Sequence, residues 1–288
     1  ATPGRRVRMP PENGLHYELF LPAAWRPSAE DTFPVVVFLH GSKDGRFSIM
    51  NSQSLPRLLA RNQSTSFDPR ACWCLDAEYA PVIAMKEAPA ASAEPFVDEM
   101  EDLRSPLADC DFAETFPAIA IMPQGWNTTA GFWNHDLLGH VEALTRQVLR
   151  TYRGDASRVA LTGQTGGGAG VWKFAAWKPQ LWSSVSAIAA PAGAEVAEKV
   201  EGLAVWVAGS TLDGESGNDR LVAALKLRHA GSVRYTRYVK APPPPDPRYR
   251  NMVGHASYDL IYRDPRFWQW AFSQRNLPAR KHWYPDAL

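Results

Sequence analysis

A glycine-rich turn between an apolar segment and a helical pattern limits most strongly how this chain can fold. Residues 158–162 (RVALT) are mostly apolar, residues 163–167 (GQTGG) form the turn, and a helical pattern begins near Ala169. A strand that turns sharply into a helix is typical of domains in which strands and helices alternate. The centre of the turn carries a hydroxyl side chain, that of Thr165.

Other segments of the chain repeat this alternation. Apolar or alternating runs that predict strands occupy residues 15–21, 34–39, 118–122, 185–189, 203–207 and 233–239. Helical spacing or composition predicts helices over residues 55–60, 137–152, 221–228 and 265–272. The pattern predicts an α/β fold with a mostly parallel central sheet and helices on both faces. No internal repeat is present, so we expect a single domain over residues 1–288.

Two predicted helices carry signals at their ends. Gly154 lies just past the helix predicted over 137–152, where glycine often ends a helix. Asp264 precedes Pro265, which together predict an N-cap and a first helical residue.

Two segments interrupt the alternation. Residues 62–115 have little periodicity, and a long insertion of this kind is either a lid or pocket wall, or a surface excursion without a role. Residues 241–247 (APPPPDP) predict a stiff, extended spacer just before His255, where it would shape one wall of a site. The alternative for this spacer is a ligand for a proline-binding domain.

Composition excludes several classes of partner and leaves the compartment open. The formal net charge of +1 indicates neither a nucleic acid nor an anionic membrane surface, and no apolar run approaches the ~20 residues of a membrane helix. Cys110 could bridge to Cys72 or Cys74 in an oxidising compartment, or all three could be free thiols. Sequons at Asn62 and Asn127 also favour a secreted protein. The start at Ala1 leads us to expect a processed or trimmed chain, and nothing in the sequence indicates the oligomeric state.

Three residues stand in an order that suits nucleophilic catalysis. Thr165, Asp213 and His255 each follow a predicted strand, and ligands of α/β sheets gather at the carboxyl ends of the strands. Nucleophile, acid and histidine, in that chain order, form the triad of α/β-hydrolases.

The chain resembles the esterase branch of the α/β-hydrolases, which includes polyhydroxybutyrate-depolymerase-like and feruloyl-esterase-like enzymes. Similar motifs lie at residues 37–41 (VFLHG), 121–126 (IMPQGW), 158–172, 205–209 (VWVAG) and 254–259 (GHASYD). Together they extend from about residue 15 to 275, leaving out 62–115 and 241–250. The family's G-x-S-x-G pattern has a serine where this chain has Thr165. The resemblance implies a carboxylic-ester hydrolase without a cofactor, acting on a small-molecule or polymer ester.

The resemblance also implies a role for individual residues. Thr165 would be the nucleophile and His255 the base that removes its proton. Backbone N–H groups of Gly166 and Ser42 would form the oxyanion hole. His40, in the same segment as Ser42, is expected to be structural.

The acid of the triad is shifted in the sequence. The family pattern places it at Leu212, whereas the nearest carboxylate is Asp213, which would orient His255. Glu215 and Asp219 are the alternatives. Three aromatic residues, Trp126, Phe132 and Trp133, either line an acyl or aromatic pocket or pack in the core.

Threonine at the nucleophile position brings two penalties. A β-branched residue at positive φ costs on the order of 1–3 kcal/mol, and its methyl group restricts χ1. Gly166 and Gly168 lack side chains that could obstruct the methyl group. An esterase with a threonine nucleophile and a catalytically silent binding protein therefore both remain open, as does acyl transfer or a lyase reaction on the same scaffold.

Metal and phosphate chemistry are not indicated. Cys72 and Cys74 have no histidine or second cysteine pair at zinc spacing, so we expect no metal. The glycine-rich turn lacks the Lys-Ser/Thr ending of a P-loop.

Overall fold

The computed structural model describes residues 1–28, 30–41, 54–60, 112–125, 132–213, 216–228, 233–238, 241, 243–244 and 251–284. Within these residues, eight strands form one sheet in the order β1-β2-β4-β3-β5-β6-β7-β8. β2 pairs antiparallel with both β1 and β4, and the other neighbours pair in parallel. The strands are β1 (Arg6–Glu12), β2 (Leu15–Phe20), β3 (Phe33–Leu39), β4 (Ile119–Pro123), β5 (Gly154–Gln164), β6 (Ser184–Ile188), β7 (Ala204–Ser210) and β8 (Val233–Tyr238).

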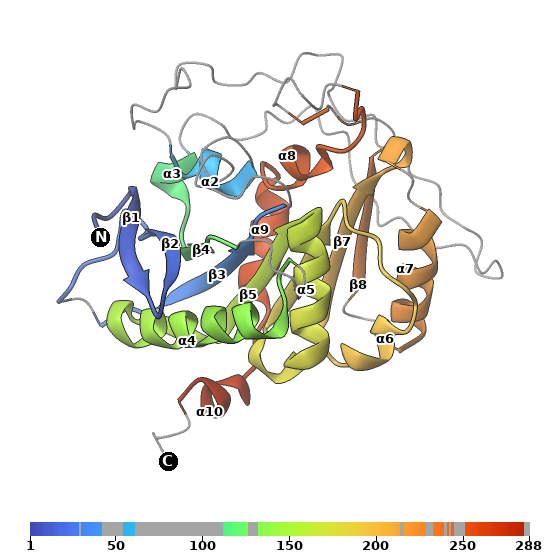
Figure 1. Ribbon diagram of the computed structural model, residues 1–288. Helices are drawn as coiled ribbons and strands as arrows, with labels where there is room; N and C mark the ends of the chain where they lie inside the picture. The colour runs from blue at the N-terminus through green and yellow to red at the C-terminus, as the bar shows by residue number, and fades with distance from the viewer. Residues whose placement is uncertain are drawn as a thin grey trace.

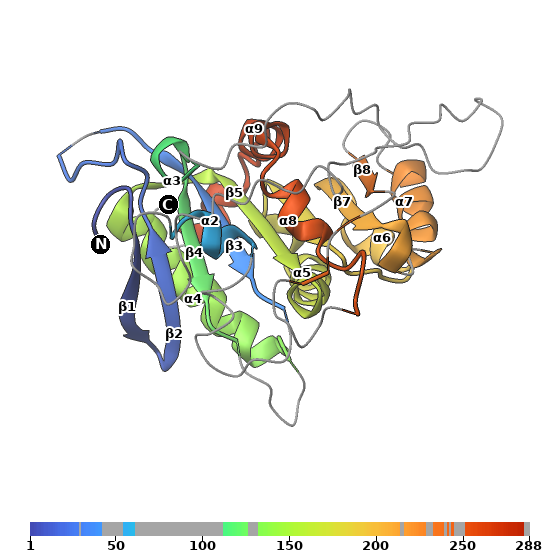
Figure 2. The same cartoon turned by 90° about the horizontal axis from the view of Figure 1, so that it is seen from above.

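Helices cover both faces of the sheet. One face packs against α4 (His135–Tyr152), α5 (Gly166–Trp177), α6 (Val196–Lys199), α7 (Ser216–Arg228) and α10 (Ala279–Trp283). The other packs against α2 (Ser54–Leu58), α3 (Phe112–Thr115), α8 (Ser257–Ile261) and α9 (Pro265–Ser273). Figure 1 shows the sheet with its helices, and Figure 2, seen from above, shows α9 on the opposite side of the sheet from α4 and α5.

Strand β3 shows why the sheet needs two helical layers. Val35 and Val37 belong to the apolar cluster on one face, and Val36 and Phe38 to the cluster on the other. Successive side chains of a strand point to opposite faces, so a continuous apolar run is stable only when both faces are covered. The prediction of a central, doubly covered strand over residues 34–39 is confirmed.

The other predicted elements are also confirmed, with one strand missed. Each predicted strand and helix overlaps an observed one, and Asp264 caps α9 by accepting a hydrogen bond from the backbone N–H of Arg266. The missed strand is β1, which contains Pro10 and Pro11. Proline cannot donate to a ladder and is tolerated at a sheet edge, which is where β1 lies.

The residue that caps the C-terminus of α4 differs from the predicted Gly154. The residue in the left-handed conformation is Arg153, with φ 58°, and its backbone N–H donates to Leu149. Gly154 instead begins β5, where a Cβ atom would come within 2.6 Å of both Leu149 and Val35. Glycine is required there by close packing of helix against sheet, and the helix ends at Tyr152 as predicted, with Arg153 and not Gly154 as its left-handed cap.

The predicted insertion lies largely outside the described residues. Residues 61–111 are not described, whereas residues 112–115 form α3. Within the described part of the chain, the helices are too short or too polar for any of them to cross a membrane.

Candidate active site

Strained backbone conformations gather at the carboxyl ends of the parallel strands. Four of the six described non-glycine residues with positive φ come after parallel strands, namely Ser54 after β3, Trp133 after β4, Thr165 after β5 and Ala189 after β6. The other two, Asn13 and Arg153, lie between β1 and β2 and at the end of α4. Such residues cost about 1–3 kcal/mol each and cluster at functional sites, where the surrounding structure holds them in place. The carboxyl edge of the sheet is therefore the candidate site.

Thr165 occupies the sharp turn between β5 and α5. Its φ and ψ are 48° and −116°, and its backbone N–H donates to Ile188 at 2.9 Å. The prediction that this position is strained is confirmed. The turn exposes the side chain at the helix N-terminus, as a strand–turn–helix nucleophile elbow requires.

Glycines allow the turn to pack against β3. A Cβ atom at Gly163 would come within 2.6 Å of the Leu39 carbonyl oxygen, and one at Gly167 within 1.9 Å. Both positions touch backbone that cannot move aside without breaking the β3–β5 pairing. The glycine pattern of the turn is therefore fixed by close approach of two backbones.

The space around the Thr165 side chain comes from a different residue than we expected. A Cβ atom at Gly41 would lie 2.9 Å from Thr165 Oγ1 and 3.3 Å from Thr165 Cγ2. A Cβ atom at Gly168 would instead meet Ala190. Gly41, which comes two residues after the end of β3, provides the space for the Thr165 side chain. The expectation that Gly168 provides this space is wrong.

The Thr165 hydroxyl is directed toward the start of α5. Its oxygen accepts a hydrogen bond from the backbone N–H of Gly166. Among the described residues, no hydrogen bond joins Thr165 to His255. The N–H group predicted as an oxyanion donor is therefore occupied by the side chain predicted as the nucleophile.

Asp213 and His255 are in direct contact. The imidazole Nδ1 lies 2.9 Å from Oδ1 and 2.8 Å from Oδ2 of the carboxylate. An ionised carboxylate can only accept, so Nδ1–H donates and Nε2 keeps its free lone pair. The side chains are 17% and 19% exposed for His255 and Asp213, respectively, so the pair opens to one side.

The turn after β7 explains how Asp213, one residue beyond the position that the family pattern predicts, reaches His255. Residues Thr211–Asp213 form a single 3-10 turn, which leaves Leu212 56% exposed and turns Asp213 toward the histidine. Of the alternative acids, Asp219 binds Arg237 at 3.1 Å and the Tyr235 hydroxyl at 3.0 Å. Glu215 lies outside the described residues.

The loop that carries His255 is fixed by its own backbone. Gly254 has φ 93°, its N–H donates to Ala241 at 2.8 Å, and the N–H of His255 donates to Met252 at 3.2 Å. The ring of Tyr258 stands perpendicular to the imidazole at 6.2 Å between centroids. Burial raises the pKa of Tyr258, and the nearby acids Asp259 and Asp213 raise it further, so this phenol stays neutral beside the histidine.

His40 is a structural residue, as expected. It is 1% exposed, and its Nε2 accepts from the Gly125 backbone N–H at 2.9 Å. Its Nδ1 is therefore the protonated nitrogen and donates to the Gly41 carbonyl at 2.8 Å. This imidazole ties the end of β3 to the end of β4 and holds Gly41 in the position that faces Thr165.

Trp133 packs in the core and does not line an open pocket. It is fully buried, lies against Gly125 and Gly170, and donates its Nε1–H to the His40 carbonyl at 3.1 Å. Of the two alternatives for Trp133, the structure supports packing in the core and not a pocket wall, because no part of the indole is accessible. Phe132 is partly buried beside His40, and the predicted site residues Trp126 and Ser42 lie outside the described residues.

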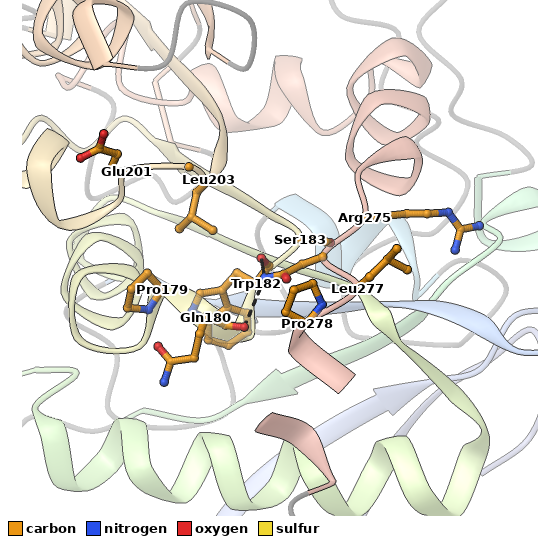
Figure 3. Close-up of a pocket in the computed structure, with 11 residues that line it drawn as sticks. Pro179, Gln180, Trp182, Ser183, Glu201, Leu203, Arg275, Leu277 and Pro278 are labelled. Atoms are coloured by element: carbon orange, nitrogen blue, oxygen red, sulfur yellow. Dashed lines mark hydrogen bonds between the residues drawn. The ribbon is translucent and has the colours of Figure 1, made fainter. Parts of the chain in front are cut away.

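A cavity of about 540 Å³ lies at the other end of the sheet. Figure 3 shows its lining, in which Ser183 directly precedes β6 and Leu203 directly precedes β7. It therefore opens at the amino ends of these strands, away from Asp213 and His255. Trp182 Nε1 and Ser183 Oγ have no partner among the described residues, but both atoms are sealed from solvent and could not reach a ligand.

Metal chemistry has no support in the described part of the chain. No group of three His, Cys, Asp or Glu side chains there is arranged to hold an ion. Cys72, Cys74 and Cys110, and with them the predicted disulfide alternatives, lie outside the described residues, as do the sequons at Asn62 and Asn127.

Two buried residues at this edge were missed by the sequence analysis. Ser54 and Asp259 are 1% and 8% exposed and are joined by a hydrogen bond, although 205 residues separate them in the chain. No local pattern pointed to either residue. The one available signal was the position of Asp259 within the motif at residues 254–259.

Comparisons with known proteins agree with the fold. No protein-family model matches the sequence, and no curated protein matches it either. A thermostable esterase matches in structure with a TM-score of 0.56 and 20% identity, over 94% of this chain and 62% of its own. This chain therefore spans less than two thirds of that esterase's length.

Two further solved structures are similar at full or nearly full length. FphF, a fluorophosphonate-binding serine hydrolase of Staphylococcus aureus, has a TM-score of 0.53 and 13% identity, over 94% of this chain and 99% of its own. A feruloyl esterase module from Clostridium thermocellum, complexed with sinapinate, has a TM-score of 0.52 and 12% identity, over 90% and 86%. At these identities the likeness establishes the architecture, and the chain has the α/β-hydrolase fold.

Proposed function

We propose that this protein is a carboxylic-ester hydrolase that works through an acyl-enzyme. Thr165 is the nucleophile, His255 the general base and Asp213 the acid that orients the imidazole. The observation that carries the proposal is the contact of both Asp213 carboxylate oxygens with His255 Nδ1, at 2.8 and 2.9 Å. A protonated Nδ1 leaves Nε2 free to accept a proton, which is the tautomer that base catalysis requires.

The reaction follows from this tautomer. Nε2 of His255 takes the proton of the Thr165 hydroxyl while the oxygen attacks the ester carbonyl carbon. The imidazolium then donates that proton to the leaving alkoxide, which departs as the alcohol and leaves an acyl-threonine ester. Water, deprotonated by the same nitrogen, attacks this ester, releases the carboxylic acid and restores the hydroxyl.

The proposed mechanism requires the Thr165 hydroxyl to leave the hydrogen bond that it accepts in the structure. The Thr165 hydroxyl now accepts from the Gly166 N–H, so it must turn about χ1 to reach His255. The same rotation frees the Gly166 N–H to stabilise the oxyanion. A β-branched side chain has few χ1 states, and each exchange moves the methyl group as well. The absence of a side chain at Gly41 provides the space for that exchange.

Similar structures support ester substrates in general terms. The three similar solved structures are those of an esterase, a serine hydrolase and a feruloyl esterase module. We therefore propose a small-molecule or polymer carboxylic ester as the substrate class.

Thr165 variants test the mechanism. We expect the parent to hydrolyse short p-nitrophenyl esters slowly, Thr165→Ser to be faster, and Thr165→Ala to lose turnover. Serine keeps the hydroxyl and lacks the methyl group that restricts χ1. Mass spectrometry after fluorophosphonate treatment should place the adduct on Thr165. Turnover by Thr165→Ala at the parental rate would refute the mechanism.

A second candidate is a catalytically silent binding protein with the same fold. It is favoured by one observation, that the Thr165 hydroxyl is bonded to Gly166 and not to His255. It predicts no covalent labelling of the parent and no turnover, with activity appearing only in Thr165→Ser. Labelling of Thr165 in the parent would exclude it.

A further inference from the structure

Ser54 makes hydrogen bonds to both sides of the candidate site. Its backbone N–H donates to Asp259 Oδ1 at 3.2 Å, and its hydroxyl donates to Gln164 Oε1. The three side chains are nearly inaccessible, at 1% exposed for Ser54, 0% for Gln164 and 8% for Asp259. Buried, closely spaced polar groups of this kind fix the elements that carry them more firmly than exposed ones.

Each partner of Ser54 adjoins a residue of the proposed triad. Gln164 is the last residue of β5 and directly precedes Thr165. Asp259 lies on α8, four residues after His255. In Figure 1, α2, which begins at Ser54, lies beside α8 at the top of the view. Ser54 thus connects the backbone that carries the nucleophile with the helix that follows the base.

The backbone of Ser54 is held in a strained conformation. Its φ is 46°, a value that a serine adopts at a cost and keeps only when its surroundings impose it. On the far side of α2, the Arg6 guanidinium donates to the Pro56 carbonyl at 2.8 Å and pairs with Glu18 at 2.9 Å. Both ion-pair partners are buried, so α2 is anchored to the antiparallel edge of the sheet.

We propose that Ser54 is a positioning residue, which sets the distance between Thr165 and His255 by binding Gln164 and Asp259. This inference rests on the proposed function, because it assigns Ser54 to the geometry of that triad. Among the described residues, Ser54 makes no hydrogen bond to Thr165 or His255. Its effect on the reaction arises because a displacement of 1 Å between reacting groups can cost about a hundredfold in rate.

The hydrogen bonds of Ser54 allow its positioning role to be distinguished from a role in stability alone. Gln164 and Asp259 each make a further interaction, so loss of one Ser54 hydrogen bond leaves neither of them without a partner. The folded state should then be weakened only as by any buried hydroxyl, whereas the turn at Thr165 gains freedom to move. We expect kcat to fall while KM, which reflects substrate contacts made elsewhere, changes little.

The test compares Ser54→Ala, Ser54→Gly, Ser184→Ala and Thr165→Ala on p-nitrophenyl esters, with urea unfolding of each variant. Ser54→Gly removes the same hydroxyl but suits the positive φ, so it folds even where alanine is strained. Ser184→Ala is the matched control, since Ser184 is equally buried, lies at the amino end of β6, and within the described part of the chain its hydroxyl bonds only to the Ala271 carbonyl.

The expected result is a fall in kcat of about tenfold in both Ser54 variants, with KM within about twofold of the parent. Ser184→Ala should keep the parental kcat at a similar unfolding midpoint. Parental kcat in both Ser54 variants, with turnover abolished by Thr165→Ala, would overturn this inference and leave the proposed function standing. Parental turnover by Thr165→Ala would overturn the proposed function, and this inference with it.

Discussion

Replacing Gly41 with alanine would place a methyl group against the side chain of Thr165. The added Cβ would lie 2.9 Å from Thr165 Oγ1, 3.3 Å from Thr165 Cγ2 and 3.5 Å from the Gln164 carbonyl oxygen. The first distance is shorter than carbon and oxygen atoms tolerate without a bond, and the second is tight. Gly41 cannot retreat easily, because the His40 imidazole donates to its carbonyl at 2.8 Å.

The size of the effect follows from two opposing terms. Overpacking a filled site costs about 1–3 kcal/mol. Alanine also lowers the conformational entropy of the unfolded chain, which stabilises the folded state by about 0.4–1 kcal/mol where the backbone conformation suits alanine. Gly41 is such a position, because its φ is not positive. The two terms together span a loss of about 0–2.6 kcal/mol, and the backbone contacts of Gly41 lead us to expect a value near the middle, a fall in the free energy of unfolding of about 1–2 kcal/mol.

A double-mutant cycle isolates the contact with Thr165. In a Thr165→Ser background the methyl group is gone and the hydroxyl can turn away, so Gly41→Ala should cost less. We expect a coupling free energy of about 0.5–2 kcal/mol between the two positions, which is the range for residues in contact. Urea unfolding followed by fluorescence of the chain's 11 tryptophans supplies the four free energies.

Gly139→Ala is the control for the cycle. A Cβ atom at Gly139, within α4, would meet nothing within 4 Å. The same substitution there should stabilise the protein by about 0.5–1 kcal/mol through helix propensity. A neutral Gly41→Ala, or a coupling below about 0.3 kcal/mol, would show that Thr165 is not confined by Gly41 and refute the packing argument.

Two further predictions concern charge. Asp213→Asn should lower kcat by about 10⁴-fold, because an amide no longer holds His255 in the Nδ1–H tautomer. A loss of less than about tenfold in steady-state kinetics would show that Asp213 is not the acid of the triad. Burial raises the pKa of Glu142, but hydrogen bonds from Lys178 and Arg146 outweigh it and lower the pKa overall. Since an unfolded glutamate titrates near about pH 4.3, this carboxylate adds stability above that pH and loses it as the pH falls through the lower folded value. With Glu142→Gln, the free energy of unfolding, measured by urea unfolding between pH 3 and 7, should fall less steeply as the pH is lowered. An unchanged fall would contradict the lowered pKa of Glu142.

Much of the fold could be predicted from the sequence because its signals are local. The doubly buried run at 34–39, the helical spacing at 137–152 and the Asp264-Pro265 helix start each depend on neighbouring residues. The edge strand β1 was missed because its prolines hide a strand pattern, although the edge position tolerates them. The end of α4 was predicted at the right residue, but its cap was assigned to Gly154 because a left-handed arginine at position 153 gives no local signal.

The sequence predicted which residue types form the candidate site, but it predicted few of the contacts between them. Asp213 was identified as the acid despite its shift, because it is the first carboxylate after a predicted strand. The sequence left Trp133 open between a pocket wall and the core, because an aromatic side chain has the same sequence pattern in both. Only the packing of its indole between Gly125 and Gly170 shows the difference.

The sequence by itself therefore determined the order of strands and helices, the glycine turn and the three residues proposed as a triad. Tertiary structure decided how those residues meet. The room for the Thr165 methyl group comes from Gly41, the hydroxyl turns toward Gly166, and Ser54 joins Gln164 to Asp259. Gly41 and Ser54 are each separated by more than a hundred residues from the groups they contact, and periodicity along the chain does not encode such contacts. The Gly41 contact follows from the register of β3 against β5, whereas the Ser54 contacts follow from the packing of α2 against α8 and against the end of β5.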